Sequence, residues 1–173
     1  MKKLLSLGLA TLLILSCLAG CSSGSKASIY IKDGAYNLTP QQYIDAVNAV
    51  IEEQGDSRYS TIPDFVASEE KIEICSFRFT LALTTNDDGY ITKFDFDWDA
   101  ESRDAYNTAP FIIGLTIGSI APDEAGNAVW AKLDMMDIVS PKYSTEASSN
   151  GTVFSYDCYG HGVFNRLIIS PEE

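Results

Sequence analysis

The densest group of chemically useful side chains in the sequence is the stretch FDFDWDAESRD, residues 94–104, with five acidic residues in eleven positions. Carboxylates are the ligands that calcium prefers, and glycosidases use them in pairs. In the first half of the stretch, aspartates alternate with Phe96 and Trp98. The stretch therefore belongs to a cation-binding loop, to an acidic catalytic site, or to a strand with one polar face.

An EF-hand calcium loop that starts at Asp95 needs a glycine at its sixth position and a glutamate at its twelfth. Those positions hold Ala100 and Tyr106, so the residues that bend and close such a loop are missing. Alternation with a period of two instead places the aspartates on one face of a β-strand, which we expect to be solvated. We predict no metal site; the weak alternative is a cation bound at the strand end by Asp97, Asp99, Glu101 and Asp104.

Other motifs for catalysis or cofactor binding are missing from the sequence. It has no G-x-S-x-G nucleophile elbow, no P-loop and no dinucleotide fingerprint. The single histidine, His161, lies between two glycines in a predicted turn, where a general base would be poorly held. We therefore expect no cofactor and no zinc site, although an acidic chain always offers pairs of carboxylates for hydrolysis.

The elements that position these residues start with a helix over residues 40–54. Thr39 can serve as its N-cap, with Pro40 in the first turn and Gln42 completing a capping box. Apolar residues then recur with helical spacing, and Gly55 suits the left-handed position after the last turn. We expect this helix to bury one face.

Residues 75–84 and 90–98 alternate with a period of two and predict a hairpin with its turn at residues 86–89. Tyr90, Thr92, Phe94, Phe96 and Trp98 then share one face. We expect this stripe to pack under helices; if part of it lines an open sheet face, it could instead stack against a peptide or a sugar.

A second hairpin is predicted near the C-terminus, with residues 154–158 and 163–170 as strands and a turn at residues 160–162. Its last strand is apolar on both faces, so we expect it to be central in the sheet. Residues 138–151 are rich in Ser, Thr and Asn and predict a loop. A short edge strand near residues 61–66 is a further option.

Two helices are predicted between the hairpins. The first starts at Thr108-Ala109-Pro110, is apolar almost all round, and is therefore expected to be buried. Its Gly114 and Gly118 are expected to allow a close approach by a neighbouring element. The second helix follows Pro122 and ends near Met136. Together the elements predict a two-layer α+β fold in the order α-ββ-αα-ββ, with an antiparallel sheet of four or five strands and helices on one face.

Two cysteines, Cys75 and Cys158, fall on apolar faces of the predicted strands. In an exported protein they could form a disulfide in the core, and two buried free thiols are the alternative. A reactive thiol is disfavoured, because no basic cluster surrounds either residue to favour the thiolate.

The N-terminus has a basic start, an apolar stretch from Leu4 to Leu15, and then Leu18-Ala19-Gly20-Cys21. The apolar stretch has the length of a signal peptide and is too short to span a membrane. The four residues resemble the lipobox of bacterial lipoproteins. This resemblance implies cleavage before Cys21 and lipid on its thiol. It predicts a signal peptide over residues 1–20 and a lipidated Cys21, which is followed by a small, polar segment that we expect to be part of a tether over 21–35. The length of the remaining chain and its predicted elements favour a single α+β domain over 36–173.

After removal of the signal peptide, ten basic and 24 acidic residues remain, a formal charge of −14. Such an acidic surface argues against binding to nucleic acid or docking on anionic lipid. We therefore expect a non-enzymatic binding module on the extracytoplasmic face of the cell membrane, held there by its lipid, with a protein or another envelope component as its ligand. The alternatives are an envelope hydrolase that uses Asp and Glu, and an inhibitor or structural partner of an exported enzyme.

Overall fold

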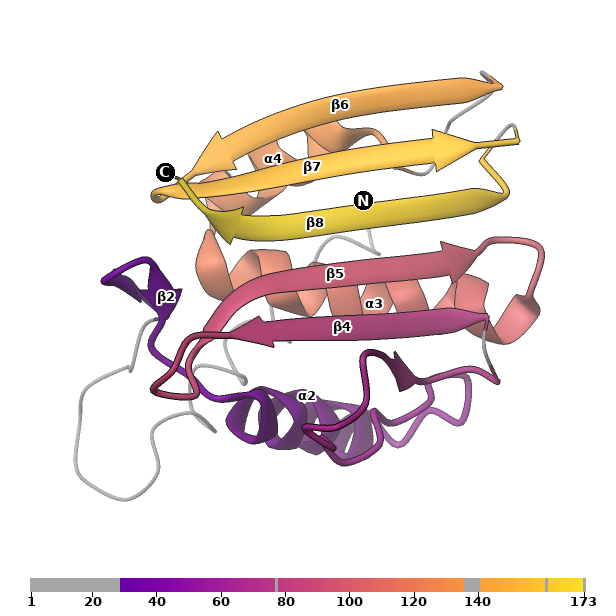
Figure 1. Ribbon diagram of the computed structural model, residues 1–173. Coiled ribbons are helices and arrows are strands. Elements are labelled where there is room, and N and C mark those ends of the chain that lie inside the picture. Colours follow the sequence, from indigo (N-terminus) through magenta and orange to yellow (C-terminus); the bar gives the residue numbers. More distant parts are fainter. Residues whose placement is uncertain (1–28, 77, 136–140, 161, 173) are drawn as a thin grey trace.

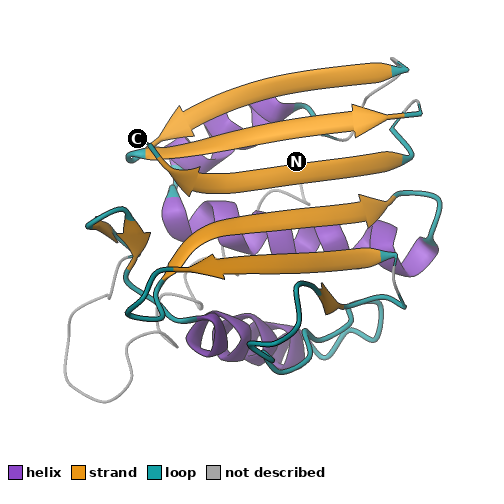
Figure 2. Cartoon of the chain, viewed as in Figure 1, coloured by secondary structure: helices purple, strands orange, loops and turns teal. Residues whose placement is uncertain are grey.

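The computed structural model describes residues 29–76, 78–135, 141–160 and 162–172. Strands in these ranges form one six-stranded antiparallel sheet and a separate two-stranded hairpin, and the helices lie on one side of the large sheet (Figures 1 and 2). The elements are β1 (Ile31–Lys32), β2 (Ala35–Tyr36), α2 (Pro40–Gln54), β3 (Ile72–Glu73), β4 (Phe79–Thr85), β5 (Ile91–Asp99), α3 (Arg103–Ile120), α4 (Glu124–Leu133), β6 (Lys142–Ser149), β7 (Thr152–Tyr159) and β8 (Phe164–Pro171).

The large sheet has the strand order β3-β4-β5-β8-β7-β6, with antiparallel neighbours throughout. The predicted two-layer α+β fold is confirmed, and the last strand, β8, is central as expected. The sheet has more strands than the four or five predicted, because β3 and β6 extend it at its two edges. These strands also alter the predicted order of elements.

Helix α2 begins and ends where its sequence predicts. The Thr39 side chain accepts a hydrogen bond from the backbone N–H of Gln42, the Gln42 side chain accepts one from the Thr39 N–H, and Gly55 adopts a left-handed conformation with φ of 61°. These contacts satisfy backbone groups that a helix end leaves without partners. Its buried face meets the sheet through Tyr43, whose ring packs edge-on against Phe94 with centroids 5.0 Å apart.

The hairpin of β4 and β5 contains a bulge that the sequence did not indicate. Thr84 pairs with Lys93, but the next residue, Thr85, pairs with Ile91. The extra residue reverses the alternation, since a one-residue shift moves side chains to the opposite face of a strand. Ile91 is therefore buried and Tyr90 is exposed, and the prediction that Tyr90 shares the apolar face of Phe94 is wrong.

Helix α3 begins at Arg103, five residues before the predicted start. Ser102 is the N-cap, and its hydroxyl accepts a hydrogen bond from the N–H of Ala105. Pro110 consequently lies inside the helix, where it cannot donate the usual hydrogen bond to the carbonyl of Tyr106. Its position was misleading because proline is common in the first turn of helices. Residues 112–120 of α3 are all buried, as predicted, whereas the added first turn is largely exposed.

Helices α3 and α4 approach each other closely at two glycines. A Cβ atom on Gly126 would lie 2.3 Å from the carbonyl oxygen of Ala121 and 3.6 Å from Cα of Gly118. No side chain fits at position 126, because a Cβ atom 2.3 Å from a backbone oxygen would overlap with it, and the backbone cannot move away. The close approach expected for Gly118 is thus observed, with α4 as the neighbour.

Two predictions about irregular segments are wrong. Most of the expected loop over 138–151 is strand β6, a polar edge strand whose Ala147 is buried on the side of α4. Residues 61–66 form no strand, because Asn48 of α2 holds the backbone of Ile62 at both its N–H and its carbonyl, each at 2.7 Å. This side chain takes up the backbone groups that a strand would need for pairing.

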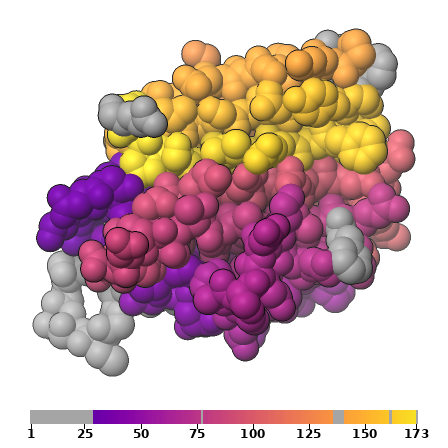
Figure 3. Space-filling view, in the orientation of Figure 1, coloured from indigo at the N-terminus to yellow at the C-terminus, as the bar shows by residue number. Residues whose placement is uncertain are grey.

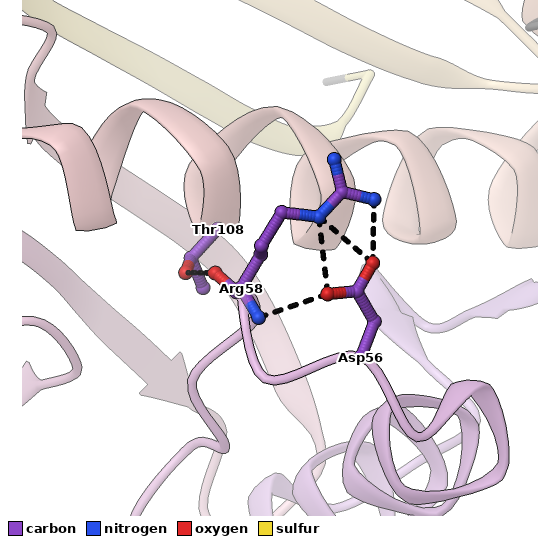
Figure 4. Close-up of polar contacts among 3 residues, drawn as sticks. All are labelled: Asp56, Arg58 and Thr108. Atoms are coloured by element: carbon purple, nitrogen blue, oxygen red, sulfur yellow. Dashed lines mark hydrogen bonds and ion pairs between the residues drawn. The ribbon is translucent and has the colours of Figure 1, made fainter.

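A compact loop over residues 56–60 follows α2 in the chain and packs against α3 (Figure 4). The Arg58 guanidinium and backbone N–H donate to the carboxylate of Asp56, and the carbonyl of Arg58 accepts from the Thr108 hydroxyl at 3.5 Å. These Arg58 hydrogen bonds lower the pKa of the Asp56 carboxyl. Tyr59 stacks on Phe111, with ring centroids 4.1 Å apart. The loop is a structural connection that the sequence did not reveal.

The described chain begins beside the β1–β2 hairpin, which is tied to the domain where the Tyr36 hydroxyl donates to Thr152 of β7 at 3.3 Å. The predicted tether over 21–35 extends into this hairpin. The signal peptide, Cys21 and the tether as far as residue 28 lie outside the described residues, as do His161 and Met136. Within the described ranges, no helix is both long and apolar enough to cross a membrane.

Candidate functional site

The side of the large sheet away from the helices, here called the open face, carries the acidic residues with which the sequence analysis began. It is turned toward the viewer in Figures 1 and 3. The pairing register aligns side chains in rows across the strands, and one row crosses all six strands of the sheet. This row consists of Glu73, Thr80, Asp97, Arg166, Asp157 and Ser144.

Asp95 and Arg166 form a bidentate ion pair on this face. Arg166 Nε and Nη2 lie 2.8 and 2.6 Å from the two carboxylate oxygens of Asp95, which is only 7% exposed. Burial alone would raise the pKa of the Asp95 carboxyl, but the hydrogen bonds and charge of Arg166, assisted by Lys93 and Lys71, lower it overall. The same contacts raise the pKa of Arg166. Asp95 is therefore a fixed anion.

The other two aspartates of the strand also have cationic partners. Asp97 lies 2.6 Å from the Lys71 ammonium and 3.8 Å from Arg166 Nε. Asp99 lies 2.5 Å from Arg78 Nη1 through one oxygen and accepts from the Glu101 N–H at 2.9 Å through the other. The predicted polar strand face is present, but the expectation that it is simply solvated is wrong for Asp95 and Asp99, which are buried.

The weak cation site at the end of β5 does not assemble. In the described ranges, no three His, Cys, Asp or Glu residues gather in a way that could hold a metal ion. Asp97 and Asp99 direct their oxygens at Lys71 and Arg78, while Glu101 and Asp104 are exposed beyond the strand end. A cation would have to displace positively charged side chains already bonded to these carboxylates.

The open face is close to neutral, although the chain as a whole carries −12. Among the described residues, five basic side chains lie on it or reach a carboxylate on it, and six acidic side chains accompany them. These residues are Lys71, Arg78, Lys93, Lys142 and Arg166, with Glu73, Asp95, Asp97, Asp99, Glu146 and Asp157. Most of the net negative charge therefore lies outside the open face.

Two exposed aromatic rings lie at one end of the open face. Phe164 of β8 and Tyr159 of β7 are direct cross-strand partners and are 58% and 46% exposed. The Lys142 ammonium lies 5.6 Å from the centre of the Tyr159 ring, within the range of a cation–π contact. We call Phe164 and Tyr159 the aromatic platform.

A shallow depression of about 210 Å³ borders the platform. It combines the flat ring of Phe164 with groups that donate and accept hydrogen bonds. Its lining consists of Arg78, Thr80, Asp97, Trp98, Asp99, Phe164 and Asn165. Sequence reasoning missed this site because it followed the aromatic stripe of β5, whose Phe94, Phe96 and Trp98 pack inward. One sequence signal could have found Tyr159: alternation along the strand places its side chain on the face opposite to that of Tyr156, which is buried. Phe164 is its cross-strand partner.

A second and larger hollow, about 590 Å³, lies between β1, the end of α3 and the C-terminus. Its lining includes Ile29, Ile31 and Ile120, and its polar groups serve the fold: Asn150 donates to the carbonyl of Ile120 at 3.1 Å. Within the core, a void of about 10 Å³ beside Tyr43 and Thr116 has room for no more than one water molecule. The larger hollow also contains one exposed aromatic ring, Tyr30, and the exposed Glu172, but its lining does not include two adjacent exposed rings like those of the platform.

Cys75 and Cys158 are both buried and both free. Cys158 is paired with Asn165, Asn165 with Trp98, and Trp98 with Phe79, beyond which Cys75 lies. Three interstrand spacings, about 14 Å in total, already separate Cys158 from Phe79, whereas a disulfide needs Cα atoms within about 7 Å. The structure thus does not bring the two thiols together, and each packs as a small apolar side chain in the core.

Comparisons with known proteins give no relative from which a function could be transferred: no family model, no curated protein and no solved structure matches this chain.

Proposed function

We propose that this protein is a lipoprotein anchored at the extracytoplasmic face of the cell membrane, and that its domain binds a neutral carbohydrate of the cell envelope on the aromatic platform. The anchor rests on the resemblance of Leu18-Ala19-Gly20-Cys21 to a lipobox. The ligand site rests on one observation: Phe164 and Tyr159 are exposed side by side on the sheet, next to a polar depression that contains both cationic and anionic side chains.

A carbohydrate fits these features better than other ligands. Sugar rings have flat faces of C–H groups that pack on aromatic rings, and hydroxyl edges that bond to accessible side chains of the depression such as Arg78, Thr80 and Asp97. Because the acidic side chains on the face slightly outnumber the basic ones, it offers no net attraction to a polyanion such as nucleic acid. Peptides that bind to sheets commonly add to a strand edge or fill a groove, and the platform is a flat area inside the sheet.

Binding without chemistry is supported by the state of the carboxylates. A glycosidase needs a carboxylic acid whose pKa is raised so that it can donate a proton. The pKa of Asp95 is instead lowered by Arg166, and Asp97 and Asp99 are engaged by Lys71 and Arg78. These contacts speak against the alternative of an envelope hydrolase at this face.

The anchor is tested by Cys21→Ala in the full chain. We expect the variant to leave the membrane fraction, because lipid attaches to this thiol, whereas the matched Cys75→Ala variant should stay there. Immunoblots of separated membrane and soluble fractions measure the outcome. Retention of Cys21→Ala at the mature size would refute the lipid anchor.

The ligand is tested by co-sedimentation of the full chain, in detergent, with insoluble cell-envelope polysaccharide, and by competition with soluble oligosaccharides cut from it. Phe164→Ala should weaken binding about tenfold, the loss expected for one stacking contact. Tyr90→Ala is the control, since Tyr90 is also exposed but lies near the other end of β5. Equal binding by the two variants, or competition by peptides in place of sugars, would overturn the proposal.

A further inference from the structure

The two edge strands of the large sheet differ in how many backbone hydrogen-bonding groups they leave available to another strand. At one edge, β3 has two residues, too short to be a template for another strand. At the other, β6 has eight residues and stands last in the strand order, with no strand of the described chain on its outer side. Figure 1 shows β6 along the upper margin of the sheet, with β7 on its inner side.

The register of β6 identifies which of its backbone groups point outward. The N–H of Gly160 donates to the carbonyl of Pro141 at 2.9 Å, so the pair of residues 141 and 160 is a hydrogen-bonded one. Hydrogen-bonded pairs alternate along an antiparallel ladder, so odd-numbered residues of β6 bond to β7. Even-numbered residues therefore direct their N–H and carbonyl groups away from the sheet. These residues are Lys142, Ser144, Glu146 and Ser148.

Helix α4 holds this edge in place from the helix-covered side. It packs against β6, where Ala147 is buried and Tyr143 is half-buried. The outward backbone groups are thereby presented by a strand that is already extended, so a partner strand gains hydrogen bonds without paying to order β6. Adding a strand to such an edge is a common mode of protein recognition.

The charges on β6 point to a second copy of this chain as that partner. Lys142 and Glu146 are exposed on the open face and are separated by Ser144, so they are symmetric about it. If two β6 strands pair antiparallel with Ser144 opposite Ser144, each Lys142 faces the Glu146 of the other copy. Moving the axis to residue 142 or 146 places like charges opposite each other, which is unfavourable.

The hydrogen-bond pattern agrees with the same register. Pairing about Ser144 matches Lys142 with Glu146 and Ser144 with itself, and all three are outward-bonding residues. We propose that two copies of this protein associate through β6 in this register and form one continuous antiparallel sheet. Because the symmetry axis is then perpendicular to the sheet, the open faces of both copies lie on the same side.

A cysteine at the symmetry axis tests the register directly. In a hydrogen-bonded antiparallel pair the Cα atoms are about 5.5 Å apart, within reach of a disulfide. Ser144→Cys in the full chain should therefore give a covalent dimer on a non-reducing gel under mild oxidation. Ser148→Cys is the control, as it lies on the same face of β6 but not opposite itself. Equal dimer yields for both, or crosslinks of Ser144→Cys only to other proteins, would overturn the proposal.

A charge exchange tests the pairing without a crosslink. Lys142→Glu and Glu146→Lys each place like charges across the axis, and each should weaken dimerisation about tenfold or more, measured by sedimentation of the full chain in detergent. The double variant carries both substitutions and should recover to within about threefold of the original protein. A double variant as monomeric as the single ones would refute the proposed register, as would single variants that dimerise like the original.

Discussion

The two faces of β5 come from one alternating sequence but depend on different interactions. Phe94 and Phe96 on the inner face are fully buried against helices, with ring centroids 6.3 Å apart. Asp95 on the outer face is nearly as inaccessible, yet it is held by one arginine from β8. A buried apolar side chain is stabilised by any apolar neighbour that fits its shape, whereas a buried carboxylate needs a cationic partner in a particular geometry.

A polar strand face can therefore be largely inaccessible to solvent. Each aspartate of β5 has a cationic partner from outside the strand, supplied by Lys71, Arg78 or Arg166. Asp95 and Asp99 are buried, whereas Asp97 stays partly exposed, and all three carboxylates are engaged by cationic side chains that a metal ion would have to displace. The first prediction addresses the inner face and the next three address the outer face, in order of decreasing effect.

Phe96→Ala should have the largest effect. Removing a fully buried ring leaves a cavity in the core and should lower the free energy of unfolding by about 3–5 kcal/mol. Chemical denaturation measures the change. Phe164→Ala is the matched control, since the same deletion at an exposed ring should cost about 0.5 kcal/mol or less. Similar losses for both variants would contradict the assignment of inner and outer faces.

Arg166→Ala should rank second. It leaves the Asp95 carboxylate buried without its partner, at a cost of about 1–3 kcal/mol in the free energy of unfolding. The cost is below that of a fully buried pair because the Arg166 side chain is 47% exposed. Adding Asp95→Asn should recover part of the loss, because the charge is then gone. Arg58→Ala breaks an equally well-formed pair in an exposed loop and should change stability too little to measure.

Protonation of Asp95 at low pH should lower the free energy of unfolding by less than Arg166→Ala does. Its pKa is lower in the folded than in the unfolded chain, where it is about 3.9. The ion pair therefore contributes stability at pH values above about 4, and this contribution disappears as the pH falls through the folded-state pKa. The loss is smaller than in Arg166→Ala, because a protonated Asp95 can still accept a hydrogen bond.

Unfolding curves recorded from pH 6 downward check this effect. The stability advantage of the original protein over Asp95→Asn should shrink below about pH 4. In an Arg166→Ala background, Asp95→Asn should bring no such change on the acid side, because the partner that lowers the pKa is missing. An advantage that grows toward low pH would show that the sign is wrong.

Lys71→Ala should have the smallest effect. Its ammonium lies 2.6 Å from Asp97, but both side chains are more than one-third exposed, so water and salt screen the pair. We expect a loss of 1 kcal/mol at most, further reduced in high salt. A loss as large as that of Arg166→Ala would mean that burial is not what separates the two pairs.

Sequence reasoning was most successful where the determinants are local. The capping box of Thr39 and Gln42 and the alternation of Phe94, Phe96 and Trp98 depend on residues a few positions apart, and both are as predicted. It failed where distant contacts decide. Asn48 keeps residues 61–66 out of the sheet, and the packing of α4 makes residues 142–149 a strand although their composition is that of a loop.

The candidate site divides in the same way. Alternation along β7 by itself places Tyr159 on the side opposite to Phe154, Tyr156 and Cys158. Because β8 is apolar on both faces, only its pairing with β7 places Phe164 beside Tyr159, and only the order β4-β5-β8 brings Arg78, Asp99 and Arg166 to the same face. Local periodicity and capping thus depend on residues that are close in the sequence. The partner of each charged side chain depends instead on which strands become neighbours, and the whole fold determines that.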